Sequence, residues 1–262
     1  MKATKIVAIL LVLLLIATSL MVSVGCGPPV TGSGDIETRE FDFSDFDRLE
    51  VGYAFDVEVT QSSSYSISVT ADDNIFEYII VSRRGDSLII TMRSNRLYLH
   101  TTQQAVITMP DLERLELSGA SRGDVSGFVS SDKLGMYLSG ASSLIISTMK
   151  SGDATLTASG ASKLSGSIDM ADGTFEISGA SNMELDGDAD DVRMDISGAS
   201  RFLGEEFTVD DANLDLSGAS SATINAQGTI DADLSGASSL YYIGSPTLGD
   251  IDVSGASKIR KR

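Results

Sequence analysis

The chain has 262 residues, of which 42% are hydrophobic, 25 are Gly and only 4 are Pro, so it can bury a core and is not a disordered chain. One Cys and one His exclude an internal disulfide framework and a zinc site built from those residue types. With 37 acidic against 19 basic residues the net charge is −18, which makes nucleic acid an unfavourable partner because phosphates are also negative.

The first segment has the pattern of a secretory signal. Lys2 and Lys5 precede a long apolar run, and small residues lead to Cys26. This end resembles that of a bacterial lipoprotein signal, which predicts that residues 1–25 are removed and that Cys26 is lipidated. Ser23 stands where that pattern usually has Leu, so an ordinary signal peptide or an uncleaved anchor over residues 6–24 is the alternative. Each possibility places the body of the protein outside the cytoplasm.

Residues 26–35 contain Pro28, Pro29 and three Gly. This composition predicts a short tether that lifts the folded part off the membrane. Loss of Lys2 and Lys5 with the signal changes the net charge of the mature chain from −18 to −20.

Residues 36–110 predict a β-rich N-terminal cap with degenerate coils. Residues 45–51 match residues 111–117 position for position in residue type. Further strands are expected at 57–59, 65–69, 87–92 and 105–109, with a turn or two of helix at 73–79 that begins at Asp72 or Asp73. Because a repeat protein needs atypical ends to cover its open edge, we interpret the segment as a cap, with a ligand-binding head as the alternative.

Residues 111–262 contain eight copies of Ser-Gly-Ala-Ser at intervals of 18 to 21 residues. This period is too short for a helical hairpin and is typical of one coil of a β-solenoid. A sharp corner requires Gly where φ is positive, and we expect Ala where a larger side chain would collide with the stacked corners. The predicted corner glycines are Gly119, Gly140, Gly160, Gly179, Gly198, Gly218, Gly236 and Gly255.

Apolar columns flank each corner. The third and the first residue before the first Ser are apolar in every copy, and the fifth residue after it is apolar in all but one, where Gly123 stands. The position between the first two columns is polar apart from Tyr137, which is the alternation of a strand with one buried face. The sequence therefore predicts an all-β fold, a right-handed parallel β-helix of about 20-residue coils.

Together these features resemble the bacterial head GIN domain family, described as autotransporter adhesin heads. The resemblance rests on residues 46–51 and 55–59 at the front, residues 85–90 in the middle and the Ser-Gly-Ala-Ser series behind, and it covers nearly all of residues 36–260. It implies a β-helical, extracytoplasmic protein. The family brings no catalytic residues to transfer to this chain.

No hydrolase, phosphate-loop, zinc-protease or nicotinamide motif occurs in the sequence. A nucleophilic Ser needs a base, and His100, the single His, is interpreted as an ordinary surface or strand-end residue. The prediction is therefore a protein that is not an enzyme and has no cofactor. The alternative is a carbohydrate-active β-helix enzyme acting on envelope or extracellular polysaccharide, because such folds can use paired carboxylates.

Two columns of carboxylates accompany the repeats. Two residues before the first Ser lie Glu116 and then, on five consecutive coils, Glu176, Asp195, Asp215, Asp233 and Asp252. Six residues before it lie Asp153, Asp172, Asp191 and Asp211. We interpret the columns as a solvated face that keeps the protein soluble. The alternative is weak binding of Ca²⁺ by the five-residue column, or of a basic partner.

The sequence thus predicts a non-catalytic surface lipoprotein of the bacterial cell envelope, attached to the membrane by a lipid on Cys26. Its β-helix is expected to be a scaffold or an adhesion-like module for an envelope glycan or protein. A purely structural spacer is a further alternative.

Overall fold

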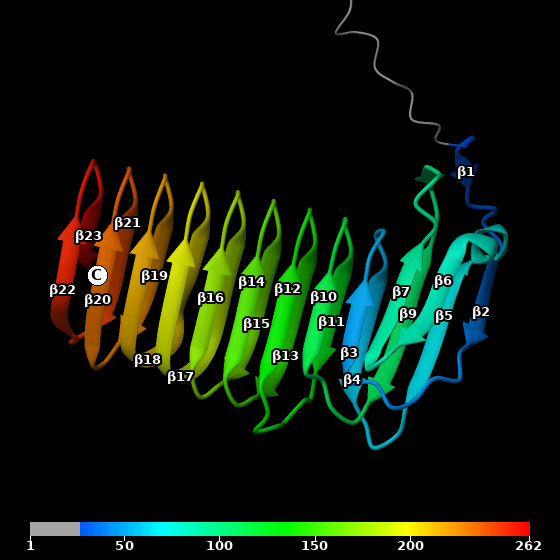
Figure 1. The fold of residues 1–262 in the computed structure, drawn as a ribbon, viewed down its shortest axis with the longest axis horizontal. Coiled ribbons are helices and arrows are strands. Elements are labelled where there is room, and N and C mark those ends of the chain that lie inside the picture. Colours follow the sequence, from blue (N-terminus) through cyan, green and yellow to red (C-terminus); the bar gives the residue numbers. More distant parts are fainter. Residues whose placement is uncertain (1–26) are drawn as a thin grey trace, which may run out of the picture.

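The computed structural model describes residues 27–262, so the predicted signal of residues 1–25 and the predicted lipidation site Cys26 lie outside the described residues. The fold is a β-solenoid with roughly 20-residue coils, as predicted. The coils stack side by side along one axis, with the cap at one end and the last coil at the other (Figure 1).

Each coil contributes one strand to each of two sheets. The first sheet contains β6 (Ile79–Arg84), β7 (Ser87–Met92), β3 (Arg48–Val51), β10 (Arg114–Leu117), β12 (Leu134–Leu138), β14 (Ala154–Ala158), β16 (Gly173–Ile177), β20 (Thr229–Leu234) and β22 (Thr247–Val253). The second contains β2 (Ile36–Glu40), β5 (Ser66–Asp72), β9 (Gln103–Met109), β4 (Asp56–Gln61), β11 (Arg122–Ser126), β13 (Ser143–Lys150), β15 (Lys163–Asp169), β19 (Ser221–Ala226), β21 (Ser239–Gly244) and β23 (Lys258–Lys261). The long strands β17 (Asn182–Ile196) and β18 (Arg201–Leu216) run through both sheets.

The coils pair in parallel and in register. Leu115 lies beside Met136, and Phe175 lies beside Met194, so the predicted apolar columns are continuous. β3 pairs in parallel with β10, with Arg48 opposite Arg114 and Val51 opposite Leu117, so residues 48–51 stack in register on the first regular coil.

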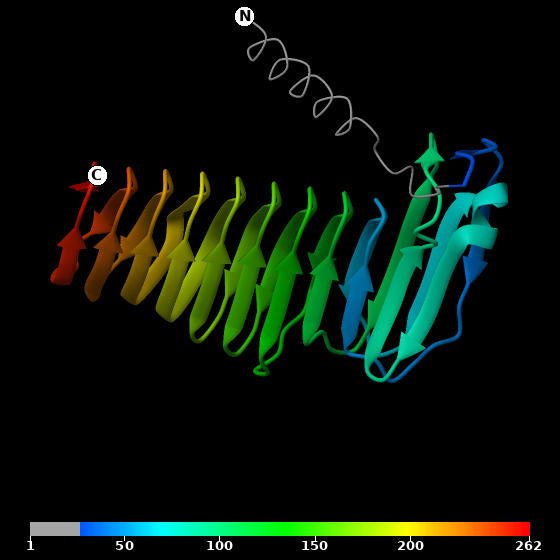
Figure 2. The same ribbon diagram turned by 45° about the horizontal axis from the view of Figure 1, so that its top comes forward.

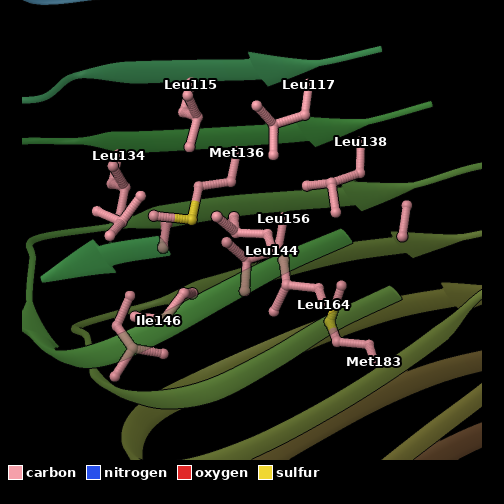
Figure 3. Packing of buried hydrophobic residues seen from close by; sticks show 14 of the residues in the cluster. Leu115, Leu117, Leu134, Met136, Leu138, Leu144, Ile146, Leu156, Leu164 and Met183 are labelled. Carbon is pink, nitrogen blue, oxygen red and sulfur yellow. The ribbon is translucent and has the colours of Figure 1, made fainter. Parts of the chain in front are cut away.

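The core fills the space between the two sheets. Figure 3 shows Leu115, Met136 and Leu156 from the first sheet facing Leu144 and Leu164 from the second. All three predicted columns are buried, except in the last coil, where their members are partly or largely exposed. The predicted gap at Gly123 has a packing reason, because a Cβ there would lie 2.9 Å from the methyl groups of two flanking leucines.

The cap covers the N-terminal face of the first coil with antiparallel strands. In the first sheet β6 pairs antiparallel with β7, and in the second β5 pairs antiparallel with both β9 and β2. A 3-10 helix, η1 (Asp73–Tyr78), follows β5, and the two-residue strands β1 (Val30–Thr31) and β8 (Tyr98–Leu99) pair separately. β1 and the loop that carries β8 lie at the same end of the cap (Figure 2).

The segment expected to be a tether is held against the cap over residues 27–35. The Asp72 carboxylate accepts hydrogen bonds of 2.7 Å from the Gly34 and Thr102 amides. These bonds hold the pKa of Asp72 below its ordinary value, chiefly through the Thr102 amide. A Cβ on Gly32 would lie 2.7 Å from Cγ of the same carboxylate, so only Gly fits there. The described part of the predicted tether is therefore docked rather than free.

Candidate binding surfaces

The glycine column of the corners fixes how the coils stack. All eight predicted corner glycines have φ between +69° and +77°. From Gly140 onward, a Cβ on each would lie 2.4–2.7 Å from the carbonyl oxygen of the corner glycine one coil before. The corner alanines are exposed, for example Ala199 and Ala219, so the expected collision at Ala was wrong. The positions in each corner that cannot hold a larger side chain are therefore the glycines, not the alanines.

The two serines of each corner have different environments. The second Ser is buried in every corner except the last, whereas the first is exposed or half-buried. Ser142 Oγ donates to the Ser139 carbonyl at 2.7 Å, and Ser162 Oγ donates to the Ser159 carbonyl at the same distance. Ser220 Oγ is buried without a partner. These buried hydroxyls are structural and do not offer a reactive group to a ligand.

The five-residue carboxylate column, here called the acidic ladder, has the predicted register. Glu176 lies opposite Asp195, and Asp195 opposite Asp215, with Asp233 and Asp252 following in the same column. All five residues are exposed on the outer face of the first sheet. The ladder is therefore a solvated line of negative charge. Among residues 27–262 no group of three or more metal-binding side chains is arranged to hold an ion, so the calcium hypothesis stays a prediction.

Two open hollows lie next to the ladder on the same face. One, of about 400 Å³, is lined by Asp215, Asp233 and Asp252, and the other, of about 450 Å³, by Asp172, Asp191 and Asp211. The second column of carboxylates thus lies parallel to the ladder, at the edge of the same surface.

Arg193 and Asn213 line both hollows and lie side by side in the register of β17 and β18. Arg193 Nη1 donates a hydrogen bond of 3.1 Å to Asn213 Oδ1. Arg193 is the only basic residue in the lining of either hollow. We call the two hollows with this pair the Arg193 surface. The sequence analysis missed it, although a lone Arg at an outward position between two acidic columns was a signal that could have identified it.

This surface offers donors and acceptors to a polar ligand. Carboxylate and amide oxygens accept hydrogen bonds, whereas a guanidinium only donates. An uncharged polyhydroxyl ligand both donates and accepts, and it carries no charge for the ladder to repel. The arrangement therefore matches neutral hydroxyl-rich ligands better than anionic ones.

A further carboxyl pair lies at the opposite corner of the coils, at Asp169 and Asp188. Burial and then the neighbouring charge of Asp169 raise the pKa of the Asp188 carboxyl. The positive charge of Lys150 lowers the pKa of the same carboxyl. The charge of Asp190 also raises the pKa of Asp188, so carboxylates of neighbouring coils repel one another here. Among residues 27–262 no such group is arranged to hold a metal ion.

His100 lies at the tip of the cap and has a φ of +51°. Its carbonyl oxygen lies against Gly32, since a Cβ on Gly32 would be 2.6 Å from that oxygen. This position agrees with the expectation of an ordinary strand-end residue. Over residues 27–262 no helix has the length and hydrophobicity needed to cross a bilayer.

The comparisons with known proteins agree with this fold. Residues 45–246 match the family described as "Putative auto-transporter adhesin, head GIN domain". A search of curated proteins found no match.

Three solved structures of Parabacteroides proteins are similar over 90% of this chain and 100% of their own chains. A "putative lipid binding protein" from Parabacteroides distasonis is 20% identical with a TM-score of 0.84. A "putative adhesin" from Parabacteroides merdae is 18% identical with a TM-score of 0.81, and another from Parabacteroides distasonis is 16% identical with a TM-score of 0.82. At these identities the likeness is one of fold. The family match covers most of the chain, and the protein therefore belongs to the head GIN domain family of adhesin-like proteins.

Proposed function

We propose that this protein is a non-catalytic surface lipoprotein of the cell envelope, held to the membrane through Cys26, whose solenoid binds a neutral glycan on the Arg193 surface. The observation that carries the proposal is the pairing of Arg193 with Asn213 between two columns of exposed carboxylates. The rigid register of β17 and β18 holds these groups in place, which reduces the ordering cost of binding.

Membership of an adhesin-like family supports binding rather than chemistry. The described residues present no cluster of metal ligands, and the buried hydroxyls of Ser142 and Ser162 donate to backbone carbonyls. The carboxylates of the ladder are exposed on an open face, whereas a glycosidase holds its two carboxyl groups on either side of the bond that it cleaves, within a concave site. These features disfavour the carbohydrate-active enzyme that the sequence left as an alternative.

Incubation of the purified protein with neutral and acidic glycans separates the possibilities. Retention of a neutral glycan without new product ends supports the binding module, and new ends would establish an enzyme. The variant Arg193→Ala with Asn213→Ala should lose retention. Arg201→Ala, an exposed arginine on the second sheet, is the matched control and should retain it. If the wild-type protein retains no glycan and produces no new ends, the structural spacer is the remaining possibility.

Attachment to the membrane is tested separately. The mature protein should carry a lipid mass on Cys26 and partition into detergent, and Cys26→Ser should block both. A mature N-terminus elsewhere, without lipid, would contradict the lipoprotein.

A further inference from the structure

The tip of the cap carries exposed leucines beside the point where the chain enters the fold. We define the cap tip as residues 93–100 together with residues 27–31. Leu97 is 55% exposed and Leu99 is 37% exposed, and both belong to the segment that pairs with the N-terminal strand. In both ribbon views this loop extends beyond the corner of the first coil (Figures 1 and 2).

The cap tip is a rigid structure rather than a loose loop. The Gly27 amide donates to the Asn95 carbonyl at 2.9 Å, and the Val30 amide donates to the Leu97 carbonyl at 2.8 Å. The Arg96 guanidinium lies 5.5 Å from the centre of the Tyr78 ring, which itself packs against Tyr98 at 5.7 Å. The leucines are thus held outward by a framework of backbone bonds and aromatic contacts.

The charge at the cap tip is opposite to that of the whole chain. No Asp or Glu occurs between Asp86 and Asp111, although the chain contains 37 acidic residues. Within the same interval lie Arg93 and Arg96. Arg93 is exposed, and Arg96 is half-buried against Tyr78. Asp72 and Asp73 lie beside the base of the tip, where their carboxylates accept hydrogen bonds from Gly34, Thr102 and Ser33. Residues 93–100 themselves carry arginines and leucines but no acid, and such a segment is suited to a bilayer with anionic headgroups.

With a lipid on Cys26, the N-terminal chain would bring this surface to a membrane. Gly27 follows the predicted lipidation site directly, and consecutive Cα atoms are about 3.8 Å apart. Because Gly27 is bonded to Asn95, a lipid on Cys26 would hold the cap tip at the bilayer surface. We propose that the cap tip contacts the lipid bilayer, with Leu97 and Leu99 entering the interfacial region and Arg93 facing anionic headgroups. This inference rests on the proposed attachment through Cys26.

Contact at the cap tip gives the molecule an orientation. The cap lies next to the lipid, and the Arg193 surface, on β17 and β18, lies several coils away along the solenoid (Figure 1). The lipid and the cap tip would be two separate points of contact with the bilayer, and together they would limit tilting of the protein about its anchor.

The chain has no Trp, so one introduced Trp reports its own surroundings. Leu97→Trp places the reporter at the cap tip, and Leu248→Trp, at a leucine that is 42% exposed on β22, is the matched control. The full-length protein, purified from membranes, is reconstituted into vesicles of phosphatidylcholine and phosphatidylglycerol with brominated acyl chains. We expect at least twofold stronger quenching of the Leu97→Trp emission than of the control. Arg93→Glu in the Leu97→Trp background should reduce that quenching.

The outcomes separate this inference from the proposed attachment. If the protein sediments with vesicles but both reporters are equally unquenched, the tip contact is wrong and the attachment stands. Equal strong quenching at both sites means that the solenoid lies flat, which also overturns the tip contact. A protein that does not sediment with vesicles and lacks a lipid mass overturns the attachment, and the tip contact with it.

Discussion

The Ala199 amide donates a hydrogen bond of 2.7 Å to the carbonyl oxygen of Gly179, one coil earlier. The same oxygen would lie 2.5 Å from a Cβ on Gly198. The Gly179 carbonyl therefore accepts the hydrogen bond that links the two corners. The same carbonyl leaves no room for a side chain at position 198. This relationship repeats from the second corner to the last and explains the Gly of these corners. The donor is a backbone amide, so the relationship places no demand on the Ala side chain.

Gly198→Ala should destabilise the protein by roughly 2 to 5 kcal/mol, because it combines left-handed backbone with steric overlap. Gly119→Ala is the matched control, since Gly119 has φ of +75° but its nearest neighbour to a Cβ is the Tyr53 nitrogen at 3.3 Å. It should cost only about 1 to 2 kcal/mol, from backbone conformation. Urea denaturation measures both. Equal losses would show that steric overlap between the corners has no role.

The buried serines give a second matched pair. Ser142→Ala removes a bonded hydroxyl and should cost about 1 kcal/mol, whereas Ser220→Ala removes a buried hydroxyl that has no partner and should be neutral or stabilising. The melting temperatures of the two variants test this difference. A loss at Ser220 as large as that at Ser142 would mean that Ser220 Oγ has a partner in solution.

Neutralising the acidic ladder should stabilise the protein. In Asp195→Asn with Asp215→Asn, two in-register carboxylates no longer repel each other or their neighbours. The gain in melting temperature should be largest at low salt and shrink as salt screens the wild-type repulsion. A gain that does not depend on salt would require a cause other than charge.

Calcium binding by the ladder also stays a prediction. Millimolar Ca²⁺ should raise the melting temperature slightly, since clustered oxygens favour this ion, and the same double variant should abolish the response. If isothermal calorimetry detects no heat of calcium binding, the calcium hypothesis is wrong and the ladder is only a solvated face.

The docked N-terminal segment should depend on pH through Asp72. Because the pKa of Asp72 is lowered in the folded state, its contribution to stability is present above the unfolded value of about 3.9 and is lost as pH falls through the folded pKa. Asp72→Asn should therefore cost about 1.5 to 3 kcal/mol at neutral pH, and this difference should close in acid. Hydrogen exchange of the Gly34 and Thr102 amides measures the loss. Asp42→Asn, an exposed carboxyl in the cap, is the control and should leave both amides protected.

The repeat made most of the solenoid predictable, because each coil repeats the same corner and columns. Even the degenerate coil at residues 48–51 was recognisable by its match to residues 114–117. The antiparallel cap strands and the docking of residues 27–34 depend on contacts between distant segments, such as Asp72 with Thr102, which no local pattern encodes. The Arg193 surface was missed for a related reason, since it becomes a site only when neighbouring coils stack.

The hydrogen bonds between coils run along the axis of the solenoid, and this direction determines how the protein would carry a tensile load. A pull along the axis stretches these bonds in series, so the load detaches one coil at a time instead of shearing whole sheets. Each coil of about 20 residues would then release roughly 70 Å of extended chain. Under tension between its two ends, the solenoid would lengthen in steps and dissipate energy at each one.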